Sequence, residues 1–284
     1  MLATDFLFEN IFMMLKKKFT LIPAAICIIM LACTSSKKMA GTAPQPPANI
    51  TINGKLFTSL YQQYAAEYRA LCYQAYNAGR MQIDRYAAPD NKPLALVTDI
   101  DETIFDNSKY AVYRGLQGKD YESISWYEWT DKSAADTMPG AGSFLEYAAA
   151  KGIEIFYITN RENRERSSTL KNLQRFALPN ADEKHLLSRI NVSSKEERRQ
   201  ALKTTHNIVL LMGDNLADFS NLFDKKNQEE RKLNTDRAAA EFGKTFIVFP
   251  NPVYGDWEAA INKYKYNFTA AQKDSIIKST LNGY

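Results

Sequence analysis

Two aspartates, Asp99 and Asp101, stand two positions apart directly after a short apolar run at residues 94–98. Residues two apart point to the same side of an extended chain, so both carboxylates could face one small space. One carboxylate can act as a nucleophile that splits a difficult displacement into two easier steps, while another gives and takes protons. By itself, however, an Asp-x-Asp pair is more typical of a loop or a helix cap.

A second pair of acids favours a catalytic role for the first pair over a loop or a helix cap. Asp214 and Asp218 follow another apolar run, at residues 208–212. Because the carboxyl ends of parallel strands meet at one edge of a sheet, we expect all four acids to converge there. Oxygen ligands of this kind suit Mg²⁺, which binds carboxylates together with a substrate phosphate. A calcium site that only stabilises the fold is the alternative.

Polar residues at two further positions could bind a phosphate group. Thr159 and Asn160 follow the apolar run at residues 153–158. A hydroxyl and backbone N–H groups at such a strand-to-helix junction can hold phosphate oxygens. Lys195 stands at the start of a predicted helix, where a positive charge is electrostatically unfavourable. A bound anion would explain this lysine, and a solvated surface lysine is the alternative.

The elements that must position these residues alternate along the chain. Helical periodicity covers residues 56–86 and ends before Pro89 and Pro93. Predicted strands then alternate with helical segments, at residues 94–98, 153–158, 185–190, 208–212 and 246–249. This pattern predicts an α/β fold with a Rossmann-like, doubly wound parallel sheet. Residues 104–138 interrupt the alternation and are rich in aromatic residues, so we expect a small cap inserted after the first strand.

Composition limits the classes of protein that the chain can belong to. Its 284 residues are enough for one α/β domain with attachments. The net charge of +4 is too mild, and too evenly spread, to indicate a nucleic-acid partner. Cys72 is the one cysteine in the part expected to fold. Its helical surroundings predict a buried small hydrophobe and not a catalytic thiol.

The N-terminal segment is predicted to be a targeting signal. Three lysines at residues 16–18 precede an apolar run at residues 19–32, which ends at Cys33. A basic start, a short apolar core and a small residue before the break are typical of a secretory signal. The run is too short for an ordinary membrane-spanning helix. A short anchor helix that stays attached is the alternative.

The end of this segment, Met30 to Cys33, resembles a bacterial lipobox, which implies cleavage before Cys33 and lipid on its sulfur. The polar, proline-rich residues 34–50 cannot build a core and are typical of a tether. We therefore predict a signal peptide at residues 1–33, this tether, and a folded domain at residues 51–284.

Six motifs, in order, resemble those of the haloacid dehalogenase (HAD) superfamily, and more closely the bacterial class C acid phosphatases, which are secreted lipoprotein 5′-nucleotidases. The resemblance covers about residues 55–265. The motifs lie at residues 99–108, 157–161, 194–198, 213–219, 232–237 and 242–257. The resemblance implies a HAD-like core and small phosphomonoesters, including 5′-nucleotides, as substrates.

The resemblance also implies roles for single residues. Asp99 corresponds to the nucleophile that forms an aspartyl-phosphate, and Asp101 to the general acid for the leaving alcohol and then the base for water. Thr159 and Lys195 correspond to ligands of the phosphoryl oxygens. Asn160, beside Thr159, is assigned to substrate binding.

A magnesium ion is the cofactor that the resemblance implies. Asp214 would hold it together with Asp99 and the backbone carbonyl of Asp101, and Asp218 fills the remaining acidic position beside the metal. Tyr254 corresponds to a residue that stacks on the nucleobase in nucleotide-cleaving members. A tyrosine that only anchors a surface loop is the alternative.

The sequence thus predicts a Mg²⁺-dependent acid phosphatase held to the outer membrane or the periplasmic membrane surface by lipid on Cys33. A carbon–halogen hydrolase of the same superfamily needs no acid two residues after its nucleophile, so Asp101 argues against that rival. A non-catalytic surface lipoprotein that binds a nucleotide or haem is the alternative from another class, and the intact acids argue against it. The aromatic-rich first helix could serve a homodimer, but periodicity does not separate an interface from a core.

Overall fold

The computed structural model describes residues 49–284. The predicted signal peptide, almost all of the predicted tether and the candidate lipidation residue Cys33 lie outside these described residues. Between Asn49 and Tyr284, none of the helices combines the length and the apolar character that a membrane crossing requires.

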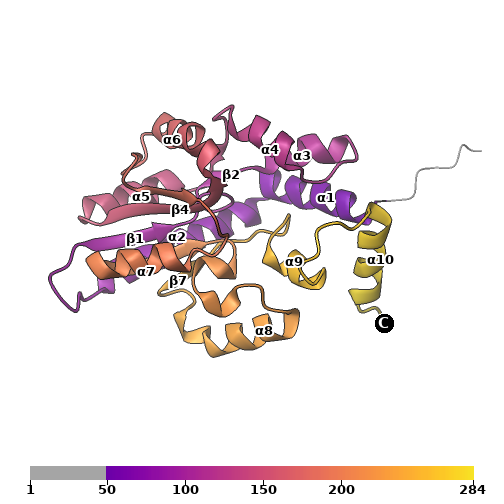
Figure 1. The fold of residues 1–284 in the computed structure, drawn as a ribbon. Coiled ribbons are helices and arrows are strands. Elements are labelled where there is room, and N and C mark those ends of the chain that lie inside the picture. The colour runs from indigo at the N-terminus through magenta and orange to yellow at the C-terminus, as the bar shows by residue number, and fades with distance from the viewer. Residues whose placement is uncertain (1–48) are drawn as a thin grey trace, which may run out of the picture. The chain divides into compact units, whose positions relative to one another are not determined.

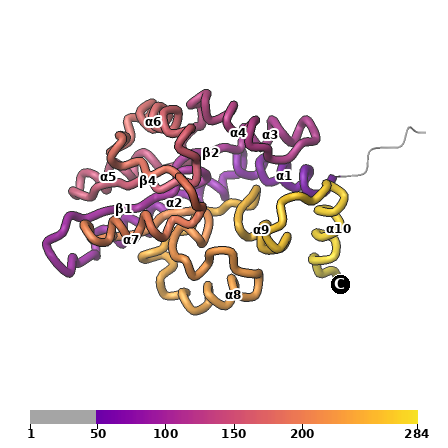
Figure 2. The backbone as a smooth tube through the Cα atoms, in the orientation of Figure 1, coloured from indigo at the N-terminus to yellow at the C-terminus, as the bar shows by residue number. Residues whose placement is uncertain are grey.

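Five parallel strands form the central sheet in the order β5-β4-β1-β6-β7 (Figures 1 and 2). They are β1 (Leu94–Thr98), β4 (Glu154–Glu162), β5 (Leu186–Arg189), β6 (Asn207–Gly213) and β7 (Phe246–Val248). The chain builds from β1 to β4 and β5, then returns to the other side of β1 for β6 and β7. The five strands predicted from apolar runs are confirmed, and β4 continues past Ile158 to Glu162.

Helices and short connecting elements make up most of the remaining described chain. The α-helices are α1 (Ile50–Tyr64), α2 (Ala66–Arg85), α3 (Ser108–Leu116), α4 (Ser123–Thr130), α5 (Ala141–Ala150), α6 (Arg166–Arg175), α7 (Glu196–Thr205), α8 (Gln228–Arg237), α9 (Asp256–Ile261) and α10 (Ala270–Thr280). The 3₁₀ turns are η1 (Asn163–Glu165), η2 (Leu216–Asp218), η3 (Asn221–Phe223) and η4 (Ala239–Glu241). Two further short strands are β2 (Phe105–Asp106) and β3 (Asp136–Thr137).

Both faces of the sheet are covered, as a doubly wound fold requires. Successive side chains of β1 alternate between two cores. Leu96 packs into the core shared with α2, α5 and α6, whereas Ala95 and Val97 pack into the core beneath α7. Figure 1 shows α5 and α7 on opposite sides of β1. The predicted fold class is confirmed, and Cys72 is fully buried in the first of these cores, as predicted.

Along the chain, an insert follows β1 before the next strand of the central sheet begins. Strands β2 and β3 pair antiparallel and bracket α3 and α4. Inside it, the rings of Tyr110 and Trp126 meet edge to face with centroids 5.1 Å apart, and Tyr121 lies 6.1 Å from Trp126. The insert therefore has a small aromatic cluster of its own.

The first predicted helical region is not one helix but two. Ala65 adopts an extended conformation, with φ −74° and ψ 127°, and separates α1 from α2. The two helices have different partners, because α1 packs on α3 of the insert whereas α2 packs on β6 and β7. Alanine is a strong helix former, so the sequence carries no sign of this break.

Candidate active site

The ends of β1 and β6 bring Asp99, Asp214 and Asp218 together. The two strands are neighbours, and the Asp99 amide continues their pairing by donating to the Met212 carbonyl at 2.9 Å. Carboxylate oxygens of the three acids lie within 4.8 Å of one another. Strands are added to one side of β1 first, as β4 and β5, and then to its other side, as β6 and β7. The gap between β1 and β6 is therefore the switch point of the sheet, where doubly wound folds bind ligands. The structure thus brings together three of the four acids whose convergence the sequence predicts.

The turn after β6 orients Asp218. A Cβ atom at Gly213 would collide with the Asp218 side chain, so only glycine permits this close approach. The Asn215 amide donates to Asp218 Oδ2 at 3.0 Å, which fixes one carboxylate oxygen and leaves the other facing the site.

Lys195 lies inside this group of acids. It is the residue before the first turn of α7, and its side chain is 5% exposed. Its ammonium contacts Asp99 Oδ1 and lies 2.7 Å from Asp218 Oδ1. The alternative of a solvated surface lysine is therefore wrong. Two carboxylates of the protein itself offset the unfavourable charge at the helix start.

The charges of this cluster do not balance. Burial raises the pKa of Asp99 to about 7, although Lys195 acts in the opposite direction. Burial, Asp218 and Asp99 together raise the pKa of Asp214 well above its ordinary value. Two buried carboxylates and the half-buried carboxylate of Asp214 thus share one ammonium. An oxygen-only donor set with surplus negative charge fits a divalent cation, since the charge of such a cation would restore the carboxylates to their ionised form.

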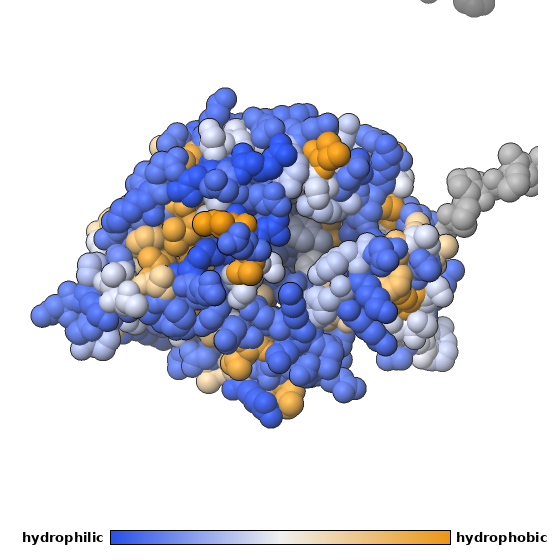
Figure 3. All heavy atoms as spheres, viewed as in Figure 1, coloured by the Kyte–Doolittle hydropathy of each residue, from blue (hydrophilic) through white to orange (hydrophobic). Residues whose placement is uncertain are grey.

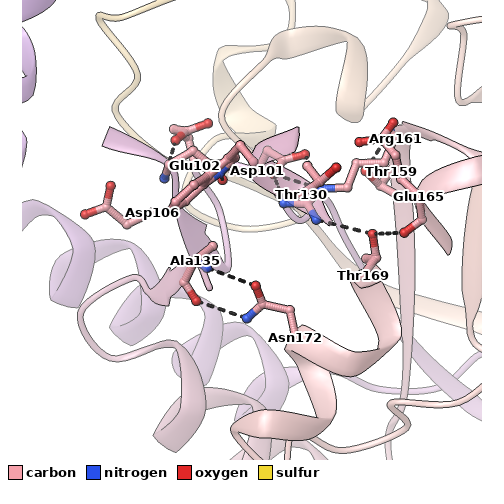
Figure 4. A network of polar contacts seen from close by, with 12 residues as sticks. Asp101, Glu102, Asp106, Thr130, Ala135, Thr159, Arg161, Glu165, Thr169 and Asn172 are labelled. Atoms are coloured by element: carbon pink, nitrogen blue, oxygen red, sulfur yellow. Dashed lines mark hydrogen bonds and ion pairs between the residues drawn. The ribbon is translucent and has the colours of Figure 1, made fainter. Parts of the chain in front are cut away.

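Asp101 does not belong to the group of three clustered acids, and its surroundings are drawn in Figure 4. Its Oδ1 accepts from Arg161 Nη2 at 2.7 Å and from Asn107 Nδ2 at 2.8 Å. The Nε of Arg161 lies 3.1 Å from both carboxylate oxygens. The nearest charge to the Asp101 carboxylate is therefore a cation contributed by β4.

The end of β4 carries the two predicted polar residues. Thr159 is fully buried, and its Oγ1 accepts from the backbone amide of Arg161 at 3.0 Å. Asn160 is exposed, and its Oδ1 accepts from Arg198 Nη2 at 3.1 Å. Arg198 also donates to the Thr159 carbonyl at 2.7 Å, so one arginine of α7 holds this strand end in place.

Tyr254 lies in the loop after β7 and is 36% exposed. Its hydroxyl donates to Oε2 of Glu102, which is a buried residue in the left-handed region with φ 55°. The other oxygen, Oε1, accepts from the Asn107 amide at 2.8 Å. Burial, followed by the charge of Asp101, raises the pKa of Glu102 to about 8. The tyrosine is thus tied by its hydroxyl to the loop that carries Asp99 and Asp101.

Sequence reasoning missed several residues that bind the predicted ones. Asn251 donates through Nδ2 to Asp214 Oδ2 at 2.8 Å. It closely follows the predicted strand at residues 246–249, so the strand-end argument could have found it. Arg161 lies three residues after the predicted strand at residues 153–158, so the same argument could have assigned it a role. Asn107 carries no such signal, because its role depends on how the insert folds back over β1.

The surface near these residues is hollowed. Figure 3 shows a depression between the insert, which contains α3 and α4, and the segment that carries α9. It lies toward the end of the sheet where the strands finish, as comparison with Figure 1 shows. Because the clustered acids stand at the strand ends, the hollow lies on the same side of the sheet as these acids.

Comparison with known proteins agrees with this geometry. Residues 23–257 match the family described as HAD superfamily, subfamily IIIB (Acid phosphatase). The solved class C acid phosphatase from Bacillus anthracis is 39% identical, with a TM-score of 0.79, over 83% of this chain and 99% of that chain. A structure of that phosphatase with tungstate bound matches with the same values.

Proposed function

The chain belongs to the acid phosphatases of HAD subfamily IIIB, and we propose that it hydrolyses phosphomonoesters through a phosphoryl group carried on Asp99. Membership of this family makes it a phosphomonoesterase, and not a non-catalytic binding protein. The observation that carries the proposal is the placement of Asp99 at the switch point of the sheet, buried beside Lys195 and followed two residues later by Asp101.

The residues divide the reaction into two displacements. A carboxylate oxygen of Asp99 attacks phosphorus, the bond to the ester oxygen breaks, and Asp101 gives that oxygen its proton. Water then attacks the phosphoryl group, Asp101 takes the proton of the water, and phosphate leaves while the Asp99 carboxylate is restored. We assign Lys195 to offset charge on the phosphoryl oxygens and the Thr159 hydroxyl to donate to one of them.

We assign the divalent cation to Mg²⁺. Asp99, Asp214 and Asp218 would hold it with the backbone carbonyl of Asp101, because hard oxygen ligands suit this ion. When bound, Mg²⁺ offsets negative charge on the phosphoryl group and positions it for in-line attack. Asn251 fixes the orientation of Asp214 for this role.

Among substrates, we propose 5′-nucleotides. Tyr254 supports this, because its ring is partly exposed while its hydroxyl is held by Glu102, so the ring has a fixed orientation for stacking on a base. Asn160 would contact the substrate at the mouth of the site. The Bacillus anthracis phosphatase has been solved with tungstate bound, and the binding of an oxyanion by that similar protein supports a phosphate ester as substrate.

We further propose a lipid anchor on Cys33, export by residues 1–33, and a tether at residues 34–50 that leads to the catalytic domain at residues 51–284. Lipidation would place the enzyme at the outer membrane or in the periplasm. There, it could release phosphate from esters without depleting cytoplasmic metabolites. A homodimer through α1 is compatible with the exposed side chains of Phe57 and Tyr64.

The direct test is phosphate release from an aryl phosphate by the wild type and by Asp99→Asn. This substitution keeps the shape of the side chain and removes the nucleophile, so we expect no turnover above the residual level. An unchanged rate in Asp99→Asn would remove the nucleophile assignment. A strong preference for 3′-nucleotides or sugar phosphates would remove only the 5′-nucleotide assignment.

A further inference from the structure

The carboxylate of Asp101 is bound unequally at its two oxygens. Oδ1 accepts from Arg161 Nη2 at 2.7 Å and from Asn107 Nδ2 at 2.8 Å. Within residues 49–284, Oδ2 accepts only from Arg161 Nε, at 3.1 Å. One oxygen is therefore anchored by two short hydrogen bonds, and the other retains capacity for a further partner.

Arg161 is itself fixed on every side. Its side chain is 2% exposed. Its Nη1 donates to Thr169 Oγ1 at 3.2 Å, and that hydroxyl donates its own proton to the Glu165 carbonyl at 2.7 Å. Because the Thr169 proton is committed to Glu165, a lone pair of Thr169 faces the arginine. Figure 4 shows this chain from Asp101 through Arg161 to Thr169 and Glu165.

Aromatic rings complete the surroundings of the guanidinium. Its central carbon lies 5.7 Å from the ring centroid of Trp126 and 5.9 Å from that of Phe105. Both distances fall within the range of cation–π contacts. Trp126 belongs to α4 and Phe105 to β2, so the insert encloses a cation that β4 provides.

Asn107 is oriented from the insert as well. Trp129 Nε1 donates to Asn107 Oδ1 at 2.8 Å. An indole nitrogen is only a donor, so the amide oxygen must face Trp129 and the amide nitrogen must face Asp101. Both anchors of Asp101 Oδ1 are thus held by the insert, one through an indole hydrogen bond and one through ring contacts.

We propose that Arg161 and Asn107 are positioning residues that hold Asp101 Oδ1, so that Oδ2 is the oxygen that exchanges the proton with the leaving group and with water. This inference rests on the proton-transfer role proposed above for Asp101. It also assigns a positioning role to Trp129, because Trp129 sets the orientation of Asn107.

The rival explanation is a buried ion pair that only stabilises the fold. The two explanations predict different losses of rate for esters with different leaving groups. An alkyl alcohol needs the proton as it departs, whereas nitrophenolate departs without one. A misplaced Asp101 therefore slows alkyl ester cleavage more than nitrophenyl phosphate cleavage, while a merely less stable fold slows both equally.

The experiment compares Arg161→Lys with the wild type on p-nitrophenyl phosphate and on an alkyl phosphate. Lysine keeps the charge and loses the fork of donors. We expect kcat/KM for the alkyl ester to fall by a factor of about 10 to 100, which is typical of a partial loss of general acid catalysis. The factor for the aryl ester should be at least several times smaller. Equal factors on both esters, or no loss on either, would overturn the positioning role.

Trp129→Phe provides a second variant that leaves the arginine untouched. It removes the indole donor to Asn107. We again expect a larger loss of kcat/KM on the alkyl ester than on the aryl ester, and both losses should be smaller than in Arg161→Lys. Arg114→Lys is the matched control, because Arg114 is a buried arginine of the insert whose donors face Asp120 and Glu122 instead of Asp101. Loss selective for the alkyl ester in this control would also overturn the inference.

A double variant separates this inference from the function on which it rests. The kcat/KM for the alkyl phosphate is measured in Asp101→Asn with and without Arg161→Lys, because cleavage of this ester depends on the proton that Asp101 gives. If Arg161 acts through Asp101, the second change adds no further loss. An added loss of the full factor contradicts positioning. If Asp101→Asn alone leaves alkyl ester cleavage unchanged, the proposed proton role of Asp101 fails instead.

Discussion

Lys195 and Asp99 are 96 positions apart in the chain, yet the ammonium of one contacts a carboxylate oxygen of the other in a buried ion pair. The same ammonium lies 2.7 Å from Asp218 Oδ1. A single lysine at the start of α7 thus joins the ends of β1 and β6. The lysine lies where a transferred phosphoryl group would need both a nucleophile and a positive charge.

Removal of this ammonium is expected to affect both activity and stability. Lys195→Met leaves the carboxylates of Asp99 and Asp218 buried without their cation, so we expect a loss of about 3 kcal/mol in the free energy of unfolding. We also expect kcat/KM to fall by about 10² or more. Lys203→Met, at the exposed end of the same helix, is the control for both measurements. Wild-type activity in Lys195→Met would contradict a role in binding the phosphoryl group.

Magnesium is expected to stabilise the folded protein through the same carboxylates. At a concentration of one hundred times its Kd, Mg²⁺ should add about 2.7 kcal/mol to the free energy of unfolding, measured as a rise in Tm. Asp214→Asn should abolish this rise, whereas Asp236→Asn, on the exposed side of α8, should retain it. Full activity after thorough dialysis against EDTA would remove the metal from the mechanism.

We expect the Tyr254 ring to contribute to the binding of nucleotides and not to that of other phosphate esters. Tyr254→Ala should raise KM for a 5′-nucleotide by about 10-fold, because base stacking on an aromatic ring contributes about 1–3 kcal/mol. The KM for a small alkyl phosphate should not change. Tyr266→Ala, at a largely exposed tyrosine, is the control. Equal effects of Tyr254→Ala on both substrates would show that the ring only anchors its loop.

A charged cluster away from the active site is expected to make stability depend on pH. Asp120 accepts from Lys55 at 2.8 Å and from Lys273 at 2.6 Å, which links the insert to α1 and α10. Burial alone would raise the pKa of Asp120, but the two lysines hold it below its ordinary value. A carboxyl group with a lowered pKa stabilises the fold above its unfolded pKa, about 3.9, and this contribution is lost as the pH falls below that value.

Asp120→Asn should therefore cost about 1 kcal/mol in the free energy of unfolding at pH 7, and progressively less below about pH 4. Denaturant unfolding at several pH values measures both quantities. The control is Asp136→Asn, whose partner Lys109 and whose own side chain are about half exposed, so we expect almost no change. A cost that does not decrease in acid would show that the Asp120 carboxylate does not act through its charge.

The sequence predicted the sheet well because buried parallel strands are continuous apolar runs bounded by polar residues. The five runs became the five strands, and the residues after β1 and β6 had to meet because these strands are neighbours. The positions of strand ends do not depend on side-chain conformations, and Asp99, Asp214 and Asp218 do converge in the structure as expected.

Other features depended on tertiary contacts that periodicity does not encode. The break at Ala65 arises because α1 packs on the insert while α2 packs on the sheet. The contact of Asp101 with Asn107, and that of Asn107 with Trp129, depend on how the insert folds back over the end of β1. Lys195 was singled out by its unfavourable place at a helix start, and its observed partners are two carboxylates that follow distant strands.

The nucleophilic role of Asp99 is tested most directly by trapping the phosphorylated enzyme. The enzyme is quenched in acid during turnover of an aryl phosphate, digested, and analysed by mass spectrometry. We expect the peptide that contains Asp99 to carry one phosphoryl group in the wild type, and to carry more of it in Asp101→Asn, because the base for the second step is lost. Asp99→Asn should carry none. Turnover without any phosphoryl group on Asp99, or a phosphoryl group located on another residue, would contradict the account.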